Sequence, residues 1–167
     1  MRPLSLLAPL AALALAACAS SPDPQPTPAF DPFAFFSGRT RGAGEIRPIV
    51  GRVRPVTVES RGRVRPDGVL VVQQRVEEEG RPARTRRWEL RRQGLRTYAG
   101  TLSDAAGPVT ARGQGDQLRI RFPMPGGLDA DQLLILRPDG RTVDNRMTVS
   151  KLGVPVARLR ETIRKTE

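Results

Sequence analysis

The sequence contains no histidine, a single cysteine and few aromatic residues, with five phenylalanines, one tryptophan and one tyrosine in 167 residues. Without an imidazole, the chain cannot form a Ser-His-Asp or Cys-His catalytic unit. One thiol can form neither an internal disulfide bond nor a cysteine-based zinc site. The sequence therefore predicts that the protein is not an enzyme and has no catalytic residues, no metal site and no cofactor.

Acidic residues are also in the minority, because 28 lysines and arginines face 17 aspartates and glutamates, a net charge of +11. Only Lys151 and Lys165 are lysines, and the arginines extend from Arg2 to Arg164. A nucleic-acid-binding protein usually gathers its cations in one patch beside stacking aromatic residues. We therefore interpret most of the arginines as solvent-facing strand residues, and we expect no nucleic acid partner.

The N-terminal segment has the pattern of a targeting signal. Arg2 precedes an apolar run, residues 4–17, that is too short to span a bilayer. The run ends in Leu15-Ala16-Ala17-Cys18, which resembles the lipobox of bacterial lipoproteins, in which the cysteine is acylated and the peptide is cut before it. The alternative is an ordinary secretory signal with an incidental cysteine. The position of the only cysteine favours a signal peptide over residues 1–17 and a membrane anchor of acyl chains on Cys18.

The residues after Cys18 predict a location and a linker. Ala19 and Ser20 lack the aspartate that resembles an inner-membrane retention signal, so we expect the outer membrane, with the protein facing the periplasm. Proline at every second position from 22 to 28 predicts an extended linker over residues 18–29. The length then leaves a single domain over residues 30–167.

Four of the five phenylalanines lie between residues 30 and 36. Two interpretations stand: an apolar flap that enters the bilayer, or a segment that packs across the first strands and closes the core. We favour the second, because the acyl chains already supply an anchor.

From residue 42 onward, apolar and polar residues alternate with the period of a strand. Residues 118–122, Leu-Arg-Ile-Arg-Phe, put apolar side chains on one face and arginines on the other. Arg-Pro-Asp-Gly turns recur at residues 65–68 and 137–140.

The last segment, residues 154–165, fits a helix face or a closing strand, and Pro155 favours the strand. Further strands are expected at residues 53–58, 69–76, 85–90, 97–102, 109–112, 133–136 and 142–149. Short strands at this spacing predict an all-β fold, an antiparallel barrel or sandwich.

Several local patterns together resemble the bacterial lipoprotein family of domain of unknown function 3833 (DUF3833). The matching segments are Phe35-Phe36-Ser37-Gly38, Gly42-Ala43-Gly44, Glu78-Glu79-Gly80, Arg86-Arg87-Trp88, residues 98–107 and residues 145–153. The chain departs from the family pattern at Gln73, Arg75 and Glu77, and it lacks an Asp-Trp pair before Asn145. The resemblance implies an envelope lipoprotein of unassigned activity, a meander closing into a lipocalin-like (calycin-type) β-barrel, and an association with membrane-lipid modification.

The candidate ligand-binding residues begin with Arg86 and Trp88, which share one strand face. If Trp88 points inward, Arg86 does too, and a buried arginine needs an anionic or hydrogen-bonding partner. That partner is either an internal carboxylate, Asp104 or Glu77, or the carboxylate or phosphate of a bound lipid. Tyr98, on the next strand, adds a donor.

Asn145 and Arg146 complete the candidate ligand-binding set, although the alternative is that they build a turn with Ser150 and Lys151. Ser150 and Lys151 point to opposite faces of a strand, which works against a nucleophile pair. The remaining acidic groups, Glu77 to Glu79 in a turn and Asp129 with Asp131 in a loop, lack the spacing of a calcium site and are interpreted as solvated.

The function that these features favour is the binding or carriage of a lipid or other apolar ligand at the periplasmic face of the outer membrane. The alternative is a structural or interaction lipoprotein whose barrel is filled by its own side chains and whose arginines contact lipopolysaccharide or another envelope protein. An apolar cavity of roughly 300 Å³ or more favours the first, and a packed interior favours the second.

Overall fold

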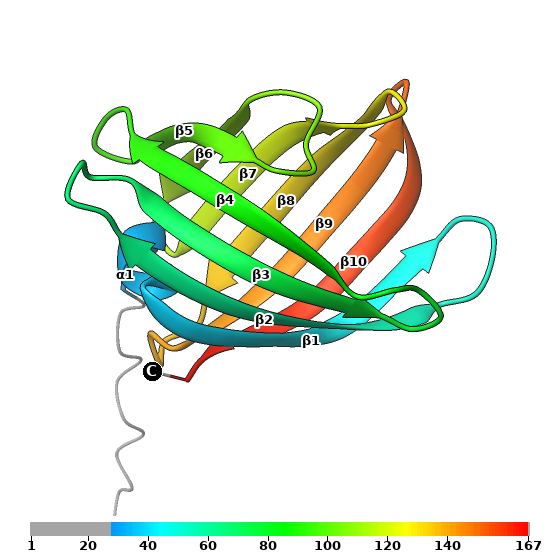
Figure 1. The fold of residues 1–167 in the computed structure, drawn as a ribbon, viewed down its shortest axis with the longest axis horizontal. Helices are drawn as coiled ribbons and strands as arrows, with labels where there is room; N and C mark the ends of the chain where they lie inside the picture. Colours follow the sequence, from blue (N-terminus) through cyan, green and yellow to red (C-terminus); the bar gives the residue numbers. More distant parts are fainter. Residues whose placement is uncertain (1–27, 167) are drawn as a thin grey trace, which may run out of the picture.

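A computed structural model describes residues 28–166. These residues form one short helix, α1 (Pro32–Phe36), and ten strands (Figure 1). The strands are β1 (Gly38–Pro48), β2 (Arg54–Val64), β3 (Leu70–Glu78), β4 (Arg84–Arg92), β5 (Thr97–Leu102), β6 (Val109–Gln114), β7 (Gln117–Met124), β8 (Leu128–Leu136), β9 (Thr142–Lys151) and β10 (Val154–Lys165). Within this part of the chain, no helix is long and apolar enough to cross a membrane.

Each strand pairs antiparallel with the next one along the chain, and β1 pairs with β10 from Thr40↔Lys165 to Pro48↔Ala157. The sheet therefore closes into a barrel and leaves no unpaired edge strand among the described residues. The predicted all-β meander and its closure are confirmed. The strand interpretation of residues 154–165 is also confirmed, because these residues are β10.

The core fills the lumen of the barrel. Alternate residues of every strand point inward, and the most deeply buried of them include Leu70, Val109, Leu118, Leu134 and Val143. The Arg-Pro-Asp-Gly segments reverse the chain as expected. The amides of Gly68 and Gly140 donate to the carbonyls of Arg65 (2.9 Å) and Arg137 (3.0 Å), and both glycines have positive φ.

Helix α1 closes one end of the barrel (Figure 1). Asp31 caps the helix by accepting a hydrogen bond from the amide of Phe33 (3.0 Å), and Pro32 suits the first helical position. Phe30, Phe33 and Phe35 are buried in the core. This segment therefore packs across the barrel, as the favoured interpretation expected, and does not present these rings to a bilayer.

Two stretches differ from the sequence-based expectation. Strand β1 was not among the expected strands, because its inward positions are Thr40, Gly42 and Gly44 and give no apolar alternation. Strand β8 begins at Leu128 and not at residue 133, so Asp129 and Asp131 lie on a strand and not in a loop. Asp131 accepts hydrogen bonds from Arg119 (2.7 and 2.8 Å), which makes it a structural ion-pair residue on the barrel exterior.

Candidate functional site

Polar side chains occupy inward positions on four strands. Apolar residues two positions before or after them point to the same side of the strand. Gln74 lies between Val72 and Val76 on β3, and Glu161 lies between Leu159 and Ile163 on β10. The same alternation turns Gln132 on β8 and Asn145 on β9 into the lumen. A polar group in the core of a barrel needs hydrogen-bond partners. A candidate site is therefore expected where these side chains meet.

The first polar group centres on Gln74. Its Oε1 accepts hydrogen bonds from Arg86 Nε (2.8 Å) and Trp88 Nε1 (2.7 Å), and its Nε2 donates to Ser60 Oγ (3.1 Å). The Arg86 guanidinium also lies 5.6 Å from the centre of the Trp88 ring. Within residues 28–166, the terminal nitrogens Nη1 and Nη2 of Arg86 have no hydrogen-bond partner. Arg86 is thus held by one nitrogen and presents the other two to a further group.

The second polar group runs from β8 to β10. Gln132 Nε2 donates to Asn145 Oδ1 (3.0 Å), and Asn145 Nδ2 donates to Glu161 Oε2 (2.8 Å). The other carboxyl oxygen, Glu161 Oε1, is buried and has no partner among the described residues. It lies against Gly42, where a Cβ atom would overlap with it. Glycine at position 42 therefore makes room for the carboxyl group.

Burial shifts the pKa values of both ionisable groups. Burial raises the pKa of Glu161, and the hydrogen bond from Asn145 and the positive charge of Arg86 only partly oppose this. Burial also lowers the pKa of Arg86, which the negative charge of Asp104 opposes, but a guanidinium keeps its proton in proteins. The lumen therefore holds a cation together with a carboxyl group whose pKa is raised by burial.

A cavity of about 40 Å³ lies between the two polar groups. Its walls include Arg86, Trp88, Asn145 and Glu161, with apolar side chains such as Ile120. The volume holds a few water molecules or the end group of a ligand. It is far below the size expected for a site that encloses a whole lipid.

A comparison with known protein families assigns the chain to one of them. The model of the family described as protein of unknown function (DUF3833) matches residues 12–165. The chain belongs to the DUF3833 family. The resemblance expected from the sequence motifs is confirmed, whereas the lipoprotein character that it implied stays a prediction.

This DUF3833 chain is similar in structure to the S-type phycobiliprotein lyase CPES from Guillardia theta. The TM-score is 0.62 and the sequence identity 10%, and the match covers 81% of this chain and 90% of the lyase chain. A likeness at this identity shows the fold alone, a lipocalin-like (calycin-type) β-barrel, which confirms the predicted fold class. No curated protein matches the chain.

The prediction that this DUF3833 protein is not an enzyme is wrong. It relied on the absence of histidine, yet a protein of the same fold is a lyase. The absence of histidine does not exclude catalysis, because carboxyl groups also serve as general acids and bases in enzymes.

Three of the sequence-predicted ligand-binding residues, Arg86, Trp88 and Asn145, line the same cavity of this DUF3833 barrel. Tyr98 points inward nearer α1, where its ring stacks on Phe33 (5.9 Å between ring centres). Arg146 points outward and is exposed, so it takes no part in the lumen site. Cys18 lies outside the described residues.

Three local interpretations of this DUF3833 sequence are corrected. Arg86 is bonded to Gln74 and not to Glu77, which points outward to Arg75 (2.9 Å), while Asp104 is exposed and acts on Arg86 only at longer range. Asn145 lies within strand β9 and not in a turn. Glu78, expected to be solvated, is buried, and its ion-pair partners are Arg54 (2.6 Å), Arg81 (3.3 Å) and Arg84 (3.4 Å).

Sequence reasoning missed Gln74, Gln132 and Glu161 as lumen residues of this DUF3833 protein. The signal was present, because each stands in the apolar phase of a strand. Leu159-x-Glu161-x-Ile163 is the clearest instance. A polar residue between apolar residues at two-residue spacing predicts an inward polar side chain.

Proposed function

We propose that the lumen of this DUF3833 protein binds the acidic end of an amphipathic molecule, with a carboxylate or phosphate lying between Arg86 and Glu161. One observation carries the proposal: Nη1 and Nη2 of Arg86 and Oε1 of Glu161 have no partners within residues 28–166, and both residues line the same cavity. Arg86 is half-buried and has no direct ion pair with another described residue, and a ligand anion would offset the cost of its partial desolvation.

The chemistry of the two groups is complementary. The guanidinium of Arg86 grips a carboxylate or phosphate with two parallel hydrogen bonds, while Gln74 fixes its Nε. Asn145 donates to Oε2 of Glu161, so a proton on this carboxyl group would be carried by Oε1. A neutral Glu161 then donates a third hydrogen bond to the same ligand oxygen or to its neighbour.

The volume of about 40 Å³ limits the enclosed part of the ligand to its end group. The apolar part then extends toward the end of the barrel opposite α1. A second, smaller apolar cluster, formed by Val56, Val58 and Val76, lies there with the partly buried Ile46 and Leu159. Binding of a hydrocarbon chain moves these side chains apart.

The proposed setting is the cell envelope. The lipobox-like segment that ends at Cys18 and the proline-rich linker support a lipid-anchored protein of the outer membrane, facing the periplasm. Acyl chains on Cys18 would hold the barrel close to a source of amphipathic acids.

The only tryptophan of the chain, Trp88, lines the cavity, so its fluorescence reports on ligand binding directly. Titration of the full chain with decanoate is expected to change the Trp88 emission in a saturable manner. Arg86→Met is expected to weaken binding about 10- to 100-fold, because a hydrogen bond to a charged group contributes about 1.5–3 kcal/mol. Arg87→Met, next to it but outward-facing, is the matched control and should bind as the wild type does. Equal titrations for Arg86→Met and the wild type would refute the site.

A second candidate function is favoured by the filled lumen. Apart from the cavity of about 40 Å³, the barrel interior between the polar groups is occupied by the protein's own side chains. This observation supports an interaction lipoprotein that works through its exterior on lipopolysaccharide or another envelope protein. Absence of any saturable change in Trp88 emission with decanoate would favour this second function.

A further inference from the structure

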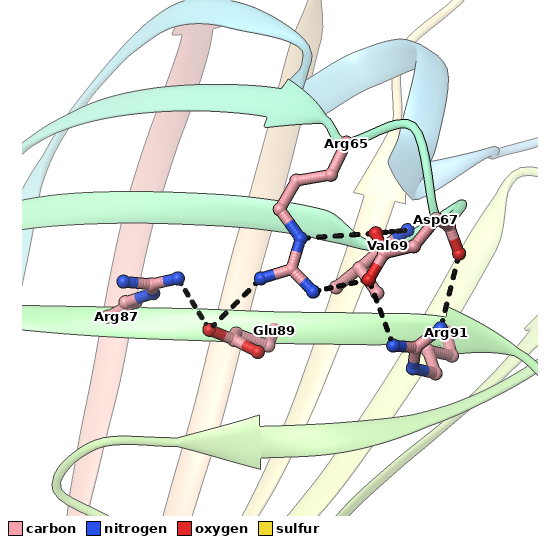
Figure 2. Close-up of polar contacts among 6 residues, drawn as sticks. All are labelled: Arg65, Asp67, Val69, Arg87, Glu89 and Arg91. Atoms are coloured by element: carbon pink, nitrogen blue, oxygen red, sulfur yellow. Dashed lines mark hydrogen bonds and ion pairs between the residues drawn. The ribbon is translucent and has the colours of Figure 1, made fainter.

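Two groups of arginines on the barrel exterior differ in their acidic neighbours. In the first group they are neutralised by acidic neighbours. Figure 2 shows such a network between β4 and the turn before β3, where Asp67 pairs with Arg65 and Arg91, and Glu89 pairs with Arg87 (2.6 Å). Asp131 on β8 likewise pairs with arginines of β7. These arginines have their counter-ions within the fold.

In the second group, six arginine side chains of β10, β1 and β2 have no counter-ion among residues 28–166, whereas Arg47 on β1 pairs with Glu45 (3.0 Å) and Arg54 on β2 pairs with Glu78 (2.6 Å). No side-chain hydrogen bond or ion pair to another residue of 28–166 is formed by Arg41, Arg61, Arg63, Arg158, Arg160 or Arg164. Strand register sets arginine directly opposite arginine at Arg41↔Arg164 and Arg47↔Arg158. The register also places Glu59 opposite Arg41 and Glu45 opposite Arg160, so two carboxylates lie among these cations. Like charges facing each other across strands are destabilising. We call the surface formed by these six arginines and Arg47 the basic face; its cations outnumber the neighbouring carboxylates, and an external anion would reduce the remaining repulsion.

The same strands end in exposed aliphatic side chains. The β1–β2 loop and the β9–β10 turn lie at the end of the barrel opposite α1 (Figure 1). They expose Ile49 (63%), Val50 (89%), Leu152 (92%) and Val154 (64%), which we call the apolar rim. The amide of Ile49 donates to the carbonyl of Val156 (2.9 Å), which joins the loop to the start of β10. The rim thus continues directly from the Arg47↔Arg158 pair of the basic face.

The backbone at Leu152 supports a functional role for the rim. Among residues 28–166, Leu152 is the only non-glycine residue with positive φ, at 50°. Such a conformation is unfavourable for leucine, and asparagine or glycine suits it better. An exposed leucine in an unfavourable backbone conformation contributes little to the free energy of unfolding of the barrel. We therefore interpret its side chain as one that contacts a partner outside the barrel.

We infer that the apolar rim inserts into an anionic lipid bilayer while arginines of the basic face bind the lipid phosphates. Exposed aliphatic tips flanked by cations are the pattern of a protein that docks on a membrane interface. Arg47 and Arg52 flank the tip of the β1–β2 loop, and Lys151 precedes Leu152. The described aromatic rings are turned inward or belong to the α1 segment, so this face offers no stacking platform for nucleic acid bases.

The inference rests on the second candidate function and is independent of the lumen site, because the two use different residues and different readouts. It assigns the apolar rim and the basic face as a binding surface on the barrel exterior, with an anionic lipid bilayer as the partner. It also orients the barrel, with α1 away from the lipid and the end opposite α1 toward it.

The test uses the full chain with Cys18→Ser, which removes the acylation site, and cosedimentation with lipid vesicles. Vesicles of phosphatidylcholine alone are compared with vesicles containing about one-third phosphatidylglycerol, an anionic lipid surface. Stronger binding to the anionic vesicles, reduced by added salt, is expected. Any contribution of residues 1–27 is the same in all variants and cancels in their ratios.

Two pairs of variants locate the binding surface. Val50→Ser with Leu152→Asn is expected to weaken binding at least tenfold, because it removes two side chains that insert into lipid. Leu95→Asn, equally exposed (94%) but at the α1 end, should change binding less than twofold. Leu152→Asn also relieves the positive φ, so weakened binding cannot be ascribed to unfolding.

Arg158→Gln with Arg160→Gln is expected to weaken binding to the anionic vesicles roughly 25-fold, at about fivefold for each arginine near the surface. Arg119→Gln with Arg121→Gln removes the same charge from β7 and serves as the control. Equal losses in the two double variants, or equal binding to neutral and anionic vesicles, would overturn the inference. Tighter binding of a DNA duplex than of anionic vesicles would also overturn it and assign the face to nucleic acid.

Discussion

Gly42 and Gly44 on strand β1 allow a sharp test of how the lumen is packed. Both face inward, but a Cβ atom would meet different neighbours at the two positions. At Gly42 it would overlap with Oε1 of Glu161, a side-chain atom. At Gly44 it would overlap with the backbone carbonyl of Arg160. Alanine at either position therefore forces a movement, but only the first can be relieved by shortening a side chain.

The expected losses in the free energy of unfolding follow from these contacts. In Gly42→Ala the Glu161 carboxyl group must move, which breaks its hydrogen bond from Asn145 (2.8 Å) and leaves a buried donor unpaired. We expect a loss of about 2–4 kcal/mol in the free energy of unfolding, from overpacking and the lost hydrogen bond together. In Gly44→Ala the backbones of β1 and β10 must separate, and the expected loss is about 3 kcal/mol or more.

A double-mutant cycle with Glu161→Ala separates the two cases, with urea unfolding as the assay. Gly42→Ala combined with Glu161→Ala should lose about 1–3 kcal/mol less than the sum of the single changes, because the clashing atom is gone. Gly44→Ala combined with Glu161→Ala should be additive within about 0.5 kcal/mol. Additivity at Gly42 would refute the placement of the carboxyl group against β1.

Two further predictions concern buried carboxyl groups. Because the pKa of Glu161 is raised in the folded protein, its neutral form stabilises the fold below the ordinary pKa, and that contribution is lost as the pH rises above it. Urea unfolding at several pH values should therefore show a decline relative to Glu161→Gln, and parallel curves would contradict this. The pKa of Glu78 is lowered, since its arginine partners outweigh its burial, so its contribution is lost as the pH falls. Glu78→Gln should cost about 1–3 kcal/mol near neutral pH, whereas the exposed Glu77→Gln should change little, and equal effects would refute the role of the arginine cluster.

Much of the fold was predictable from local patterns. Alternation in segments such as residues 118–122 and the two Arg-Pro-Asp-Gly turns predicted an antiparallel meander, because strand period and turn geometry are local properties. Strand β1 escaped prediction for a physical reason. Its inward side chains are small to allow close approach of β10, so the apolar signal was absent where packing was tightest.

The lumen site was predictable only in part. The inward placement of Arg86 followed from its two-residue spacing from Trp88, and the structure places both in the cavity wall. Its partner did not follow, because Gln74 and Arg86 are brought opposite each other by the pairing of β3 with β4. The approach of Glu161 to Gly42 depends on closure between the first and last strands, which no local pattern encodes.

The order of residues along the chain sets the period of the strands, the positions of the turns, the large excess of arginine and the apolar segment that ends at Cys18. Each of these depends on neighbours in the chain. Which arginines have counter-ions, which carboxyl groups are buried, and how little of the lumen is empty are set by the folded barrel. Those properties arise from residues far apart in the sequence, because barrel closure brings β1 against β10 and thereby sets the distances and the burial on which pairing and pKa depend.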